Sequence, residues 1–135
     1  MAIQDTKINA LKEIVLTRFQ RDQLILAADA PNRVVSIARN TIQLVAVREA
    51  HSVVGGAACT ITVEKLTSTT APGSGTALLT AAIDLTATIN TVVAPALTAT
   101  LADLQFAAGD RVGLKFTGTQ TGLVGTISLE FRRID

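Results

Sequence analysis

The chain has 135 residues, a formal net charge of +1 and a hydrophobic fraction of 48%, with a mean hydropathy of +0.42. This length suits one domain with a real core, and the balanced charge of both halves excludes the basic surface that nucleic-acid binding requires. No stretch reaches the run of about 18 apolar residues that a membrane span needs, so we expect neither nucleic acid nor a membrane as a partner.

The beginning of the chain has no settled periodicity. Gln4–Glu13 could form about two helical turns, but Ile14–Ala27 mixes apolar and charged residues at irregular spacing. We therefore predict an N-terminal arm over residues 1–30, followed by a single domain over residues 31–135.

The segment Thr41–Val54 is apolar on both faces of a predicted strand. Its apolar residues fall into two alternating sets, with Ile42, Leu44 and Ala46 in one set and Val45 and Val47 in the other. Such a strand is either central in its sheet or covered on its outer face by a partner. Val45 and Val47 are therefore our candidates for an oligomer contact.

Threonine marks the back of the chain as strand-prone, because sixteen of the nineteen threonines lie from Thr60 onward and β-branched residues favour strands. Four segments there alternate apolar and polar residues, as half-buried antiparallel strands do. Their apolar sets are Cys59, Ile61 and Val63; Leu79, Ala81, Ile83 and Leu85; Val112, Leu114 and Phe116; and Ile127, Leu129 and Phe131. We expect a core that includes Ile61, Val63, Ile83, Leu85, Val112, Leu114, Phe116, Ile127, Leu129 and Phe131.

Glycine and proline separate these strands. Gly55-Gly56, Thr70–Gly75, Gly109-Asp110 and Gly118–Gly122 read as turns and loops. Pro95 lacks a backbone donor, so its segment should be an edge strand or a strand end. Short strands at this spacing predict an all-β fold, an antiparallel β-sandwich of about eight strands.

The residues that could carry catalysis or bind a metal are few. His51 is the single histidine, and the adjacent Ser52 would point to the opposite face of a strand. A distant serine or acid could still complete a triad, so a small hydrolase using His51 stays a minor hypothesis. One histidine and one cysteine, Cys59, are too few for a common zinc site, and we interpret Cys59 as a small buried hydrophobe.

Calcium binding would have to use Asp84, Asp103 or Asp110, but no aspartate-rich loop of ligand spacing is present. Trp and Tyr are absent, which disfavours sugar-binding and single-strand nucleic-acid-binding domains, since these stack their ligands on exposed aromatic rings. We expect a non-catalytic protein without cofactor or metal.

Two stretches, Thr69–Leu85 and Leu104–Gly118, resemble small virion proteins of tailed bacteriophages. These Thr/Ala-rich β-sandwiches, often of jelly-roll type, serve as head decoration (cement) proteins, and the resemblance covers roughly residues 40–134. It implies a jelly-roll-like homotrimer that sits on the outer surface of the virion and stabilises the lattice of the major capsid protein. It implies no active site.

Attachment to the capsid is expected to use the arm, whose apolar residues need a partner's surface to become buried. The predicted capsid-binding residues are Ile8, Leu11, Ile14, Leu16, Phe19, Arg18 and Arg21. The alternative function is a tail-fibre or baseplate module that binds a receptor or glycan, although the missing Trp and Tyr count against it.

Overall fold

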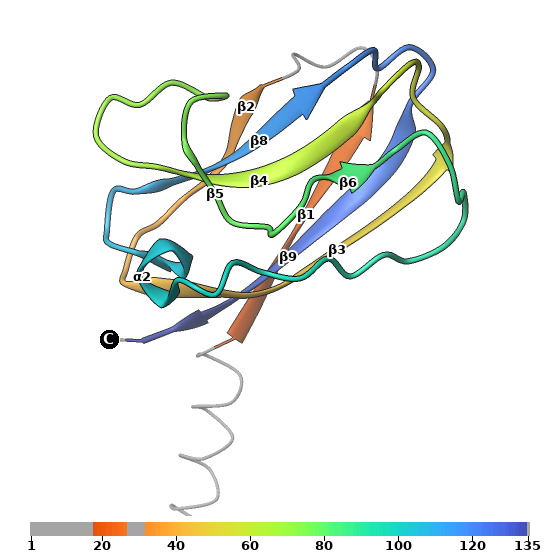
Figure 1. Cartoon of the computed structure of the whole chain (residues 1–135). Helices are drawn as coiled ribbons and strands as arrows, with labels where there is room; N and C mark the ends of the chain where they lie inside the picture. The colour runs from red at the N-terminus through yellow and green to blue at the C-terminus, as the bar shows by residue number, and fades with distance from the viewer. Residues whose placement is uncertain (1–17, 27–31, 135) are drawn as a thin grey trace, which may run out of the picture.

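The computed structural model describes residues 18–26 and 32–134, which form nine strands and one four-residue helix (Figure 1). The strands are β1 (Arg18–Leu26), β2 (Arg33–Ile37), β3 (Ile42–Val53), β4 (Thr60–Leu66), β5 (Thr76–Ala77), β6 (Ile83–Asp84), β7 (Gln105–Phe106), β8 (Arg111–Thr117) and β9 (Val124–Arg133), and α2 is Leu101–Leu104. All pairings between strands are antiparallel. The chain is therefore an all-β sandwich, as the sequence predicts.

The two sheets have the strand order of a jelly roll. One sheet, sheet A, has the order β1-β9-β3-β7, and the other, sheet B, has the order β2-β8-β4-β5, with β6 also paired to β4. The pairs β1·β9, β2·β8, β3·β7 and β4·β5 are nested, as in one long hairpin folded over onto itself. This nesting defines a jelly roll rather than an immunoglobulin-like sandwich.

The core lies between the two sheets. All ten residues that alternation placed inside are buried, and Leu114, Ile127, Leu129 and Phe131 have no exposed surface. Alternation succeeds in β4, β8 and β9 because each is a regular strand with one face on the core. Cys59 is also fully buried, as expected.

A bulge explains why β3 is apolar on both faces. Leu44 pairs with Phe131 and Ala46 with the next residue, Glu130, so Val45 is one extra residue on β3. Ile42 and Leu44 face the core before the bulge, and Val47 faces it afterwards. Since β3 lies between β9 and β7, the strand is central, which is the first of the two interpretations drawn from its sequence.

The predicted strand from Leu79 to Leu85 is interrupted. Only Ile83–Asp84 is strand, and Ala81 is exposed, although Leu79, Ile83 and Leu85 are buried. The chain bulges outward between β5 and β6 and returns to the same partner, β4. Alternation alone could not show this insertion, because the apolar residues on both sides of it still reach the core.

The chain between β6 and α2 closes one side of the sandwich, running beside β3 (Figure 1). Val93 exchanges two backbone hydrogen bonds of 2.8 Å with Glu49 of sheet A. Leu97 forms an isolated bridge with Leu79, next to sheet B. This closing segment, residues 85–100, contains Pro95, so the proline lies at an edge of the sandwich as predicted.

Strand β1 belongs to the segment predicted as an arm. It pairs with β9 along its whole length, and Ile25 on it is fully buried in the core. Residues 1–17 and 27–31 lie outside the described residues. Among the described residues, no helix is long and apolar enough to cross a membrane.

Candidate interaction surface

Three of the predicted capsid-binding residues, Arg18, Phe19 and Arg21, lie at the start of β1. The other four, Ile8, Leu11, Ile14 and Leu16, lie outside the described residues. Phe19 stacks on the buried Phe131 with 5.4 Å between ring centroids, and the guanidinium of Arg21 lies 5.1 Å from the Phe19 ring centroid. Packing of Phe19 against the core thus fixes the start of β1 and the position of the arginine beside it.

A groove of about 740 Å³ opens between β1 of sheet A and β2 of sheet B. Its apolar lining consists of Phe19, Val34, Val35, Ile37, Ala38 and Ile42. Ile37 is 62% exposed there, an unusual position for a large apolar side chain. The groove lies on the side opposite the closing segment, where no described part of the chain covers β1 and β2.

The described charged residues of this groove are all of one sign. Arg21, Arg39 and Arg133 line it, together with Ser36 and Asn40, and no carboxylate is found among the described lining residues. Arg39 is exposed. A groove that combines apolar side chains with several guanidinium groups has the composition of a protein-binding site, because aromatic residues and arginine are enriched at interfaces.

The outer face of sheet A is divided into a charged half and an apolar half. In the charged half, Glu130 lies between Arg18 and Arg48, with N–O distances of 3.6 and 3.4 Å. The apolar half carries exposed Leu24, Val53 and Val124, with the exposed Thr126 beside them. Val124 pairs with Val53, and Thr126 pairs with Leu24. Such a patch is unusual on a solvated sheet face, where outward positions are normally polar.

The two predicted oligomer contacts lie near the bulge in β3. Val47 is buried in the core of its own chain, with 2% of its surface exposed, whereas Val45 is half-buried. The bulge turns Val47 inward, so its side chain is not part of the outer face. The exposed apolar residues of sheet A lie further along β3 and on its neighbours.

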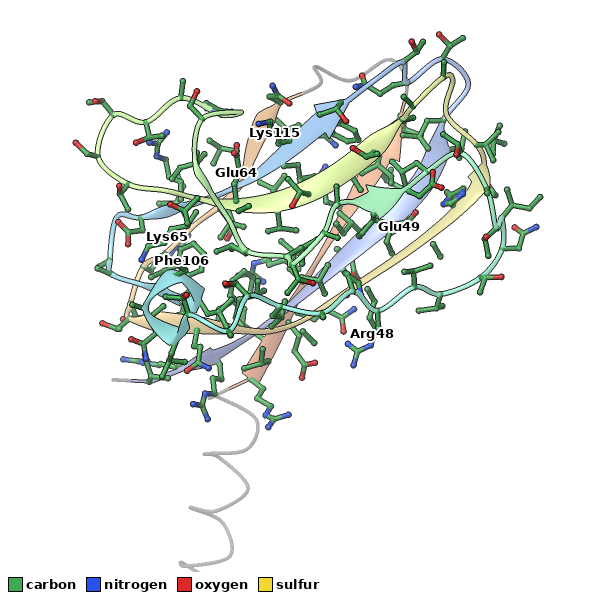
Figure 2. The ribbon with its side chains drawn as sticks, in the orientation of Figure 1. Arg48, Glu49, Glu64, Lys65, Phe106 and Lys115 are labelled. Carbon is green, nitrogen blue, oxygen red and sulfur yellow. The ribbon has the colours of Figure 1, made fainter. Side chains whose placement is uncertain are left out.

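Glu49 and His51 form a buried pair on the inner face of β3, each with 1% of its surface exposed. The Nδ1 atom of His51 lies 3.0 Å from Oε1 of Glu49. Burial raises the pKa of Glu49 above its ordinary value, although the hydrogen bond and the charge of His51 lower it. Figure 2 shows Glu49 and its neighbour Arg48 on opposite sides of β3, so Glu49 faces the core while Arg48 faces outward.

The second nitrogen of His51 is also engaged, since Nε2 lies 2.7 Å from the carbonyl oxygen of Ala87. Ser52 points away, with its hydroxyl 3.4 Å from the carbonyl oxygen of Val124. A histidine that acts as a general base needs a nitrogen within reach of a nucleophile or substrate. His51 has an acid partner, as a triad would, but both of its nitrogens hold the fold together.

Glu64 is a second buried acid, with 1% of its surface exposed (Figure 2). Its carboxylate accepts hydrogen bonds from the backbone N–H groups of Gly73 and Gly75, the latter at 3.0 Å. Arg111 donates to the carbonyl oxygens of Ser68 and Thr70 at 2.8 Å. The glycine-rich loop 67–75 is thus fastened to sheet B at both ends by one acid and one base.

Two of the three acidic residues considered for calcium, Asp84 and Asp110, serve as acceptors in turns. Asp84 accepts hydrogen bonds from the backbone and hydroxyl of Thr86, which lower its pKa, and Asp110 accepts one from the backbone N–H of Ala107. Over residues 18–26 and 32–134, no three His, Cys, Asp or Glu side chains gather as metal ligands. Burial raises the pKa of the Cys59 thiol.

Comparison with known proteins gives one distant structural likeness. No family model matches the chain, and no curated protein matches it. A solved structure described as the cyanophage Pam1 capsid asymmetric unit contains a chain that is similar over 87% of this chain and 81% of that chain, with a TM-score of 0.42 and 11% identity. A likeness this distant does not assign a function.

Proposed function

We propose that this protein is a non-catalytic structural component of a tailed-phage virion that binds the outside of the capsid and stabilises the lattice of the major capsid protein. The observation that carries the proposal is the groove between β1 and β2, which is open, apolar and lined by three arginines. It contains Phe19 and Arg21, two of the residues that the sequence assigned to capsid binding. The resemblance of Thr69–Leu85 and Leu104–Gly118 to decoration proteins supplies the partner.

The homotrimer is part of the same proposal. The apolar half of the outer face of sheet A, with Leu24, Val53 and Val124 exposed, supports a contact between copies better than Val47, which lies in the core. Large exposed apolar patches are typical of interaction surfaces. Two results together would contradict the trimer: sedimentation that finds only monomer in solution, and a map of the particle that shows no threefold density for this protein.

The proposed function is tested by binding to capsids of the phage that encodes the protein, prepared without it. Arg21→Glu should weaken cosedimentation with these capsids by at least about tenfold, because it reverses a charge in the groove without touching the core. Lys115→Glu on β8 is the matched control and should bind as the wild type does. If the wild type does not bind capsids at all, the function is wrong; if Arg21→Glu binds normally, the contact lies elsewhere.

A further inference from the structure

We propose that the groove between β1 and β2 receives an extended segment of the capsid partner in which apolar and acidic residues alternate. This inference rests on the proposed function for the identity of the partner. Its geometric basis is independent, since it comes from the two strand edges, the apolar lining and the charge of the groove.

The position of the groove favours an extended segment. β1 is the last strand of sheet A and β2 the last strand of sheet B on the same side of the sandwich. An edge strand presents backbone N–H and C=O groups that an added strand can pair with. The opposite side of the sandwich is already occupied in this way, because Val93 pairs with Glu49 and Leu97 with Leu79. The closing segment shows how an extended chain fits against this sandwich.

The lining of the groove favours alternation in the added segment. Side chains of a strand point alternately to opposite faces, so one set of positions can meet the apolar wall while the other set reaches the rim. Val35, Ile37 and Phe19 belong to that wall. Burial of an exposed side chain such as Ile37 provides the favourable free energy of such contacts.

The charge of the groove favours acidic residues at the positions of the added segment that reach the rim. Arg21 and Arg39 are exposed, and among the described lining residues no acidic side chain lies beside either of them. Guanidinium groups bind carboxylates with paired hydrogen bonds of defined geometry. Asp or Glu side chains therefore complement this groove, whereas Lys and Arg are repelled by it.

The test is a selection from a display library of short random peptides on the intact protein. Enriched peptides should alternate apolar with acidic residues. Ile37→Glu and Arg39→Glu should each weaken their binding by at least about tenfold. Ile89→Glu changes a comparably exposed residue, 47% against 62%, on the closing segment, and should leave binding unchanged. Binding should also slow amide exchange in Arg33–Ile37.

Three outcomes overturn the inference: no enrichment above background, enrichment of basic peptides, or preferential binding of anionic vesicles or oligonucleotides that Arg39→Glu abolishes. These results are separable from the capsid test. If the protein decorates capsids but selects no acidic peptide, the proposed function stands and the inference about the groove is wrong. A protein that selects such peptides but binds no capsid has the groove specificity with a different partner.

Discussion

Nδ1 of His51 lies 3.0 Å from Oε1 of Glu49, and the two residues are neighbours on the inner face of β3. The ring's other nitrogen meets the carbonyl oxygen of Ala87, and the backbone of Glu49 pairs with Val93. One charged or proton-sharing pair thus joins β3 to the closing segment. It provides the fold with a polar contact where an apolar pair would have been expected.

Removing the histidine should be costly. His51→Leu leaves the Glu49 carboxyl buried without its partner, and we expect a loss of about 3 to 5 kcal/mol in the free energy of unfolding. The double variant Glu49→Leu/His51→Leu should lose less than His51→Leu alone, since it leaves no buried acid unpaired. Urea denaturation measures both. A double variant that is less stable than His51→Leu would contradict this account.

The stability of the pair should depend on pH through Glu49. Its pKa is raised in the folded protein, so the folded state binds the proton more tightly than the unfolded state does. That contribution is complete below the ordinary value of 4.5 and is lost as the pH rises through the folded pKa. The stability of the wild type minus that of Glu49→Gln should therefore fall as the pH rises above 4.5, and a series of urea titrations would show it. A constant or rising difference would exclude this linkage.

Leu114 tests the core. It is fully buried on β8, and Leu114→Ala should lower the free energy of unfolding by about 2 to 5 kcal/mol, because it leaves a cavity. Val92→Ala, at a residue 65% exposed, is the control and should change stability by less than about 0.5 kcal/mol. A loss below about 1 kcal/mol for Leu114→Ala would show that the site is not tightly packed.

Glu64 tests the fastening of loop 67–75. Glu64→Ala leaves the N–H groups of Gly73 and Gly75 without their acceptor, which should cost about 1 to 3 kcal/mol. Hydrogen exchange at these two amides should speed up more than exchange in β8. Glu130→Gln removes only half-exposed surface pairs and should cost less than about 1 kcal/mol. Unchanged exchange in the loop would mean that Arg111 alone holds it.

The start of β1 sets the limit for truncation. A chain that begins at Arg18 keeps all pairs between β1 and β9 and should unfold cooperatively. A chain that begins at Ala30 lacks the buried Ile25 and exposes the edge of β9, so we expect a clearly lower melting temperature and a tendency to aggregate. Thermal unfolding followed by circular dichroism compares the two. Equal melting temperatures would show that β1 is an accessory strand.

The sequence predicts correctly those strands in which apolar and polar residues alternate without interruption. β4, β8 and β9 each bury one face, so their apolar sets are the core set. Alternation did not predict β1, because β1 is an edge strand. Arg21 and Gln23 pair with Leu129 and Ile127, whose side chains face the core. At the edge of the sheet, the side chains of Arg21 and Gln23 can nevertheless reach solvent. A strand with so few apolar inward residues has no period to detect.

The bulge in β3 shows a second limit of prediction from the alternation of apolar and polar residues. A one-residue insertion exchanges the two faces of a strand, so the pattern before Val45 and the pattern after it cannot be read with one phase. The same shift brings Glu49 and His51 inward. Their pairing could not be foreseen, because the alternating rule assigns polar residues to the outside unless a partner for them is known.

The two flanks of the sandwich are unequal, and this sets how copies can join by their edges. On one flank, a neighbour that added a strand beside Glu49 would have to displace Val93, and one that added a strand beside Leu79 would have to displace Leu97. On the other flank, no described strand pairs with the outer edge of β1 or of β2. A molecule with two open flanks could polymerise into an endless ribbon, whereas a molecule with one can join a single neighbour and then stops. We therefore expect the closing segment to limit the addition of further strands on its flank of the sandwich.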